Sequence, residues 1–179
     1  MKIHLIGPGG AGKTTTAKLL ALQLGYDCFD LDQYFMQTVG DISTFIDQFG
    51  YEQYAQKNIE CYFNLIEHID RNSTSAIIAC SSGLMTYSEN IHMNYLELKK
   101  QILQHPFTFV LLPSLCFKTC VQVIVTRQMN RPYLKTSPDK ERDKITQRFY
   151  MYSQLACKII LTDVQPMCVV NRIKTQLDQ

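Results

Sequence analysis

A glycine-rich loop near the start of the chain constrains the fold more than any other feature. It reads G-x-x-x-x-G-K-T over residues 7–14, between an apolar segment at 3–6 and a run with helical spacing that extends to Leu24. Glycines let a backbone curl tightly enough to crowd N–H donors around an anion, and the start of the following helix adds about half a positive charge. The pattern predicts a phosphate site. A glycine-rich turn between core elements is the simpler alternative.

The loop sequence also indicates which of its residues bind the phosphates and which binds the metal ion. Lys13 can reach the β- and γ-phosphates, and the Thr14 hydroxyl can bind Mg²⁺. We therefore expect ATP and Mg²⁺ as cofactors. The residues expected around the phosphates are Gly9, Gly10, Ala11, Gly12, Lys13, Thr14 and Thr15.

Composition limits the classes of partner. The chain has 179 residues, which fits one domain, and a net charge of +2 with 19% charged residues, which does not indicate a nucleic-acid binder. No apolar run approaches the roughly 18 residues of a membrane span. We expect a cytoplasmic monomer that binds a small molecule, without nucleic acid or membrane partners.

The cysteines do not form a recognisable metal or disulfide pattern. There are seven, scattered along the chain and without a C-x-x-C pair. Cys116 and Cys120 are one helical turn apart, which allows a metal or redox pair. Two reduced, half-buried thiols are the favoured interpretation.

Apolar segments alternate with helical patterns along the whole chain. Such alternation implies a parallel sheet with helices on both faces and ligands at the carboxyl ends of the strands. We predict an α/β fold with three layers, α/β/α, and five parallel strands. The expected strands are 3–6, 27–29, 76–80, 107–112 and 158–161, and the expected helices are one ending at 24 and those at 33–38, 42–48, 52–69, 94–104, 115–127, 140–156 and 166–177.

Two stretches outside the loop suggest functional chemistry. Residues 127–140 hold two prolines and four basic residues with weak apolar periodicity, so they form either a basic lid over the phosphates or an ordinary solvated loop. Asp30 and Asp32 lie two apart at the end of a short predicted strand, so both should point to the same side. Asp30 is the candidate to hold the metal's water shell and Asp32 to orient or deprotonate a hydroxyl, unless they only cap the next helix.

These segments together resemble the shikimate kinase family. The resemblance covers LIGPGGAGKTT at 5–15, LGYDCFDLDQYF at 24–35, a strand ending in a glycine turn, RPYL at 131–134 and Arg-x-x-x-Tyr at 148–152, in family order. It implies the P-loop kinase fold as a single domain over 1–179. It also implies a substrate-binding helical segment at about 31–70, a lid at about 127–140, and ATP-dependent phosphorylation of a shikimate hydroxyl.

The resemblance assigns roles to individual residues. It implies Asp30 near Mg²⁺, Asp32 on the substrate hydroxyls, Arg131 in the lid over the phosphates and Arg148 on the substrate carboxylate. Arg127 is implied as a further contact on the lid side. Lys13, Asp32 and Arg131 are then the catalytic residues.

Two departures from the family pattern bear on the acceptor. The family's Gly-aromatic-Arg segment, whose arginine binds the carboxylate, reads Gly50-Tyr51-Glu52 here, and its three-glycine turn reads Ser81-Ser82-Gly83. A Glu52 carboxylate about 4 Å from the substrate carboxylate would repel it by up to ~4 kcal/mol at an effective dielectric near 20. This favours a neutral polyol or an amine-bearing substrate. The Ser82 hydroxyl can donate to a substrate oxygen beside Gly83.

Other functions remain open at this point. A nucleoside or nucleotide kinase shares the loop, sheet and lid, and Tyr51, Tyr54 and Phe63 are candidates for a base pocket. A nucleotide-binding module without catalysis is a second alternative, motivated by the altered turn and Glu52.

Overall fold

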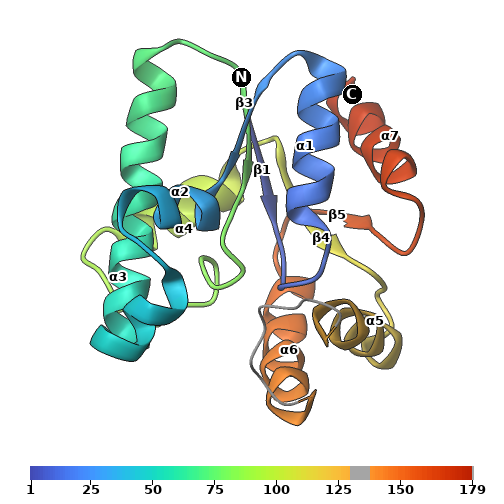
Figure 1. Cartoon of the computed structure of the whole chain (residues 1–179). Helices are drawn as coiled ribbons and strands as arrows, with labels where there is room; N and C mark the ends of the chain where they lie inside the picture. Colours follow the sequence, from blue (N-terminus) through green and yellow to red (C-terminus); the bar gives the residue numbers. More distant parts are fainter. Residues whose placement is uncertain (130–137, 179) are drawn as a thin grey trace.

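Five parallel strands form one sheet at the centre of the molecule. The structure is a computed structural model, and it describes residues 1–129 and 138–178. The strand order is β2-β3-β1-β4-β5, so β1 lies in the middle and both of its neighbours run parallel to it (Figure 1). The strands are β1 Lys2–Ile6, β2 Asp27–Asp30, β3 Ala76–Ala79, β4 Thr108–Leu112 and β5 Lys158–Leu161.

Helices cover both faces of this sheet. One face packs against α1 and α7, and the other against the remaining helices, with α5 and α6 near the carboxyl ends of the strands (Figure 1). Register explains the division, because Leu5 pairs with Ala79 and Phe109, and all three point toward α1 and α7. The helices are α1 Lys13–Leu24, α2 Leu31–Thr38, α3 Ile42–Arg71, α4 Tyr95–Gln104, α5 Phe117–Met129, α6 Pro138–Ser153 and α7 Pro166–Leu177.

This arrangement confirms the predicted three-layer fold with five parallel strands. The helix boundaries follow local chemistry. α1 ends at Gly25, whose φ of 67° lets its N–H bond the Ala21 carbonyl. The predicted helices 42–48 and 52–69 are joined in α3, with a break at Gly50 where φ is 87°. Of the predicted lid at 127–140, the first residues end α5 and the last begin α6, while 130–137 fall outside the described residues.

One local prediction was wrong. Asp32 is not on the strand: β2 ends at Asp30, and Asp32 lies in the first turn of α2. The physical reason is the cap, because the Asp30 carboxylate accepts from the backbone N–H groups of Asp32 and Gln33 and so starts the helix at Leu31. The strand-alternation argument for the direction of Asp32 therefore does not apply.

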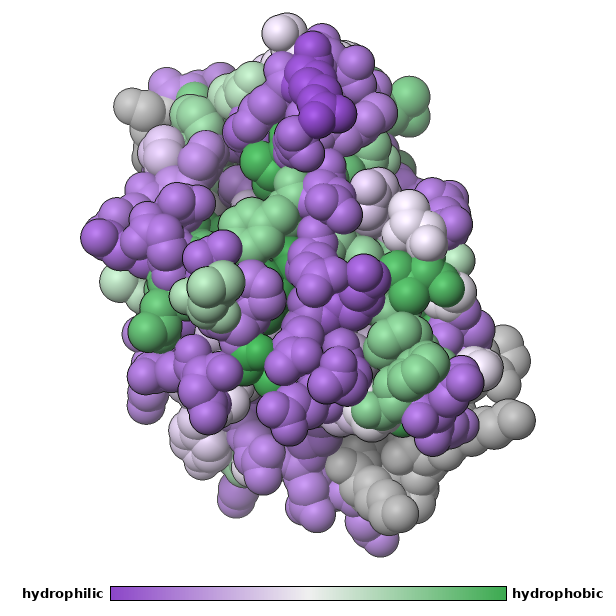
Figure 2. All heavy atoms as spheres, turned by 90° about the vertical axis from the view of Figure 1, so that its left-hand side faces the viewer, coloured by the Kyte–Doolittle hydropathy of each residue, from purple (hydrophilic) through white to green (hydrophobic). Residues whose placement is uncertain are grey.

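The outer surface of the α2 and α3 layer is mainly polar. Figure 2 shows this side of the molecule with hydrophilic residues over most of the face and apolar residues in separate patches. The apolar sides of these helices instead face the sheet, where Phe35, Ile59 and Leu65 are fully buried. Among the described helices, none combines the length and apolarity needed to cross a membrane.

A buried histidine is held neutral beneath α3. His4 is 3% exposed, its Nε2 lies 3.0 Å from the Tyr62 hydroxyl, and its ring meets that of His105 edge-on. The pKa of His4 is lowered from 6.5 to about 3, mainly by burial and also by the neighbouring charges of His105 and Lys2. Protonating His4 in the folded state is therefore costly.

We expect acid to destabilise the fold through His4. Because the folded pKa lies below the unfolded one, the contribution is complete above pH 6.5 and is lost as pH falls. Between pH 7 and 5.5 the free energy of unfolding should drop by about 1 kcal/mol from this group. Urea unfolding at both pH values measures the drop. His4→Gln should reduce it, and His68→Gln, at an exposed imidazole, should not. An equal drop in all three proteins contradicts the assignment.

Candidate active site

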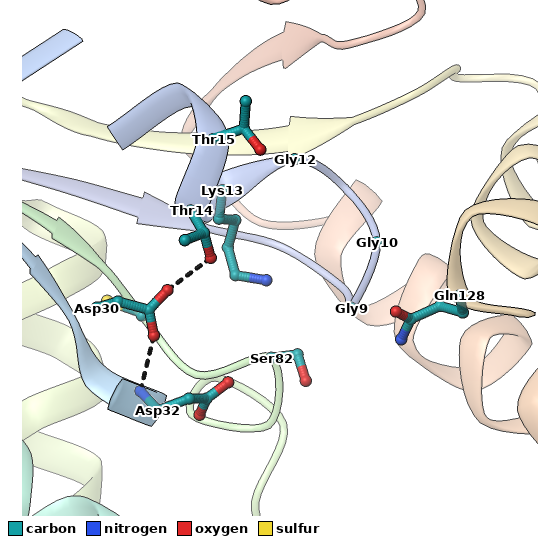
Figure 3. A pocket seen from close by; sticks show the side chains of 11 residues that line it. Gly9, Gly10, Gly12, Lys13, Thr14, Thr15, Asp30, Asp32, Ser82 and Gln128 are labelled. Carbon is teal, nitrogen blue, oxygen red and sulfur yellow. Dashed lines mark hydrogen bonds between the residues drawn. The ribbon is translucent and has the colours of Figure 1, made fainter. Parts of the chain in front are cut away.

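One polar cavity opens where the carboxyl ends of the strands meet the glycine-rich loop. Figure 3 shows side chains from the loop, from α2 and from the segment after β3 converging on it. This is the edge of the sheet at which ligands were predicted to bind. The lining residues are Gly9, Gly10, Gly12, Lys13, Thr14, Thr15, Asp30, Asp32, Cys80, Ser82 and Gln128.

The loop holds a buried lysine. Gly12 caps α1 with φ of 94°, a conformation that side chains rarely adopt. The Lys13 ammonium is 9% exposed and donates to the carbonyls of Gly7 at 2.8 Å and Pro8 at 2.9 Å. Burial lowers the pKa of Lys13 to about 8, although the nearby Asp32 carboxylate raises it. The predicted cation therefore lies at the loop, and it is still mostly protonated at neutral pH, which is about one unit below its pKa.

Asp30 caps a helix and also contacts the phosphate loop, so the cap does not exclude the predicted metal role. Its Oδ1 caps α2, while its Oδ2 accepts from the Thr14 hydroxyl at 2.5 Å. The two predicted metal-binding residues are thus in direct contact. Hydroxyl and carboxylate oxygens are the donors that Mg²⁺ prefers.

Asp32 lies beside the lysine and is mostly buried. Its Oδ1 accepts from the Ser81 hydroxyl at 2.5 Å. Burial raises the pKa of Asp32, an effect that the Ser81 hydrogen bond opposes and the Asp30 charge reinforces. The two carboxylates predicted to act together line the same cavity, although they reach it from a strand end and from a helix.

Arg148 meets the altered turn after β3. Its Nη1 donates to the Ser82 hydroxyl at 2.9 Å, and its Nη2 donates to the Tyr51 hydroxyl at 3.4 Å. The Tyr152 hydroxyl bonds the Ser82 carbonyl at 3.1 Å and so fixes the turn from α6. At Gly83 an added Cβ would lie 2.7 Å from the Tyr87 ring, which explains why this one glycine of the turn is retained.

The structure does not bring every predicted residue to the cavity. Glu52 is exposed, and within the described part of the chain it makes no ion pair; its neighbour Tyr51 contacts Arg148 instead. Ala11 lies within the loop but is buried in the core on the α1 side of the sheet. Arg127 donates to the carbonyl of Gly10 at 3.3 Å and to that of Thr162 at 2.8 Å.

Two further predictions concern Arg131 and the pair of Cys116 and Cys120. Arg131, the predicted lid contact, lies outside the described residues. Cys120 is buried and Cys116 exposed, both are free thiols, and the described residues contain no group of three or more His, Cys, Asp or Glu side chains suited to a metal ion.

Sequence reasoning assigned no role to three residues that hydrogen bonds link to this site. Ser81 contacts Asp32, Asn58 contacts Ser81, and Tyr87 contacts Asn58. A signal for Asn58 was present, since it falls at helical spacing between the apolar residues Tyr54 and Tyr62. A polar residue on the buried face of a helix needs a hydrogen-bond partner, and this one finds it near the active site.

The fold and the site define a P-loop kinase: a parallel sheet, a phosphate loop after the first strand, and carboxylates after the second. The family model described as shikimate kinase matches residues 9–178, and the chain therefore belongs to the shikimate kinase family. Members of this family are small-molecule kinases that use ATP as phosphate donor. The predicted membership is confirmed.

Curated relatives and solved structures agree with this assignment. The shikimate kinase of Marinomonas sp. is 25% identical over 175 residues, which cover 96% of this chain and 88% of the relative. Shikimate kinase of Bacteroides thetaiotaomicron has a TM-score of 0.72 at 21% identity, covering 100% of this chain and 99% of that one. Shikimate kinase of Acinetobacter baumannii, solved in complex with shikimate, has a TM-score of 0.69 at 22% identity. The match covers 99% of this chain and 90% of that one. These structural likenesses concern the fold.

We expect nucleotide affinity to depend on the proton of Lys13. Phosphate favours the charged ammonium, so the Kd for ADP should rise as pH increases through about 8, by up to about tenfold per pH unit. Isothermal titration calorimetry from pH 7 to 9.5 measures this. Lys13→Arg is the matched control, because a guanidinium stays charged and the pH dependence should disappear. A Kd that does not change with pH in the native chain contradicts the prediction.

Proposed function

We propose that this chain transfers the γ-phosphoryl group of ATP to a hydroxyl of shikimate, in a reaction that requires Mg²⁺. Family membership supports the class of reaction. The observation that carries the assignment is that Lys13 and Asp32 line one cavity, so a phosphate-binding cation and an acceptor-binding carboxylate lie side by side. The relative from A. baumannii binds shikimate, which supports the choice of acceptor.

The loop side of the cavity binds the phosphates. Lys13 exchanges its bonds to the Gly7 and Pro8 carbonyls for bonds to phosphate oxygens. The backbone amides of the loop donate to the other phosphate oxygens of the nucleotide. Thr14 and Asp30 are the residues that would hold Mg²⁺, and their contact at 2.5 Å gives an oxygen-only donor pair that suits this ion. When bound, Mg²⁺ neutralises charge that develops on the phosphates.

The α2 side of the cavity binds and orients the acceptor. Asp32 accepts a hydrogen bond from the acceptor hydroxyl and orients it toward the terminal phosphate. It takes the hydroxyl proton as the new O–P bond forms, while the bond from the γ-phosphorus to the bridging oxygen of ATP breaks and ADP leaves. Phosphoryl transfer needs this alignment more than a strong base, because the transition state is loose. Arg131 remains our proposal for a lid cation that neutralises the transferring group.

Arg148 supplies the positive charge for the acceptor carboxylate. The lysine and the arginine of α3 are already paired: Lys57 with Glu60 at 2.8 Å, and Arg71 with Glu67. The hydroxyls of Ser82 and Tyr51 already bond Arg148, so they are placed to share the same carboxylate. A monomeric state and a cytoplasmic location remain predictions of the sequence.

The alternative acceptors have less support. A neutral polyol or an amine was favoured because Glu52 was expected at the substrate, yet Glu52 is exposed. A base pocket is not favoured either, since Tyr54 is buried and Phe63 packs against Tyr62 and His92. A module without catalysis does not account for a half-buried carboxylate beside the loop lysine.

Asp32→Asn should reduce kcat for shikimate by about a hundredfold or more, because an amide neither accepts the proton nor aligns the hydroxyl in the same way. Coupled detection of ADP under saturating ATP measures the loss. Asp47→Asn, at an exposed position on α3, is the matched control and should keep the native rate. Undiminished turnover in the Asp32 variant would rule out that Asp32 aligns the substrate hydroxyl and takes its proton.

Arg148→Met should raise KM for shikimate about tenfold to a hundredfold, since a charge-assisted bond to a carboxylate contributes about 1.5–3 kcal/mol. Steady-state kinetics measure it. Glu52→Ala should leave this KM within about twofold. If instead the Glu52 variant binds shikimate far more tightly, Glu52 faces the acceptor. Turnover of a neutral polyol, cytidine or cytidine monophosphate in preference to shikimate would overturn the assignment.

A further inference from the structure

A buried glutamine at the end of α5 faces the phosphate loop. Gln128 is 5% exposed, lines the cavity, and lies one turn after the buried Ile124 on the same face of the helix. Figure 3 shows its amide end directed toward Gly9, across the cavity from Thr14 and Asp30. Gln128 is therefore a polar group on the buried face of α5, held against the loop.

Gly9 leaves room for this amide. A Cβ added at Gly9 would lie 2.5 Å from the Gln128 Nε2 and 3.5 Å from its Cδ, so one of the groups would have to move. The backbone itself does not require glycine here, because Gly9 is not in the left-handed region, unlike Gly10 at a φ of 79° and Gly12 at 94°. The amide thus occupies the space that a side chain at residue 9 would fill.

The neighbours of Gly9 indicate which phosphate lies there. The Lys13 ammonium bonds the carbonyls of Gly7 and Pro8, the two residues before Gly9, so ammonium and amide border the same stretch of loop. The lysine of such a loop reaches the β- and γ-phosphates, while backbone N–H groups cradle the α- and β-phosphates. The Ser82 Oγ, on the acceptor side, would lie 3.8 Å from the added Cβ. Gln128 therefore faces the place where the terminal phosphate meets the acceptor side.

A side-chain amide suits a phosphate oxygen at this place. It carries two N–H donors and no negative charge, so it can donate to an anion without repelling it. A hydrogen bond to a charged group is stronger than one between neutral groups, and more so where water is largely excluded. During transfer, charge spreads over the three equatorial oxygens of the phosphoryl group, so a further donor beside Lys13 stabilises it.

We propose that Gln128 is a further phosphate-binding residue, whose side-chain amide donates a hydrogen bond to an oxygen of the terminal phosphate of ATP. Gly9 is then the residue that gives the amide access to that phosphate. The inference rests on the proposed function for the place of the phosphates, but not for the identity of the acceptor. Because ADP lacks the terminal phosphate, Gln128 should distinguish ATP from ADP.

Gln128→Met keeps the length of the side chain and removes its donors. Isothermal titration calorimetry on the full chain with Mg²⁺ should show the Kd for the β,γ-imido analogue of ATP raised about tenfold or more. The Kd for ADP should stay within about twofold. Gln122→Met, at an exposed position on the same helix, is the matched control and should leave both constants unchanged. A residue that only packs α5 against the loop would change both nucleotides alike.

Gly9→Ala tests the same contact from the loop. Its methyl group would meet only the far end of a flexible side chain, so the fold should be kept while the amide is displaced. The Kd for the ATP analogue should rise as in Gln128→Met, again with little change for ADP. Gln128→Ala removes the obstacle, so adding Gly9→Ala to it should have no further effect. The Gly9 variant also tests the proposal if Gln128→Met does not fold.

An unchanged Kd for the ATP analogue in Gln128→Met, an equal loss for ADP, or full additivity of Gly9→Ala and Gln128→Ala overturns the proposal. Failure of the proposed function is distinguishable from these results. If the native chain does not phosphorylate shikimate but Gln128→Met selectively loses the ATP analogue, the acceptor is wrong and the role of Gln128 stands.

Discussion

The buried ammonium of Lys13 is the group around which the site is arranged. A charge taken out of water is costly unless partners replace the lost hydration, and here two loop carbonyls and the Asp32 carboxylate do so. The carbonyls come from Gly7 and Pro8, so the loop must curl back on itself, which the left-handed φ of Gly12 permits. Because β1 is the central strand, the loop that follows it lies in the middle of the edge formed by the carboxyl ends of the strands.

The two carboxylates beside Lys13 differ in surroundings, and this difference separates their roles. Asp30 ends β2, caps α2 and bonds the Thr14 hydroxyl, so it is held at the phosphate side. Asp32, in the first turn of α2, is bonded by Ser81, and in the proposed function it faces the acceptor. A helix that starts between the two acidic residues thus gives them different positions at the cavity, whereas on one strand both side chains would point to the same side. In the proposed function these positions correspond to the metal and the acceptor.

The acceptor side is built from residues that lie far apart in the chain. Arg148 on α6 meets Ser82 after β3 and Tyr51 at the break in α3, where Gly50 leaves the helical conformation. This break decides which neighbour of Gly50 faces the site. It is Tyr51 that reaches Arg148, while Glu52 is exposed and is not among the residues that line the cavity.

The sequence by itself determined the phosphate loop, the alternation of strands and helices, and the placement of Asp30. These depend on spacing between neighbours in the chain, which a periodic pattern records. Only the tertiary structure decided that Ser81 bonds Asp32 across 49 residues and that Arg148 bonds Ser82 across 66. Such contacts depend on how α3 and α6 pack against the sheet, and no local pattern encodes the distance between side chains that packing brings together.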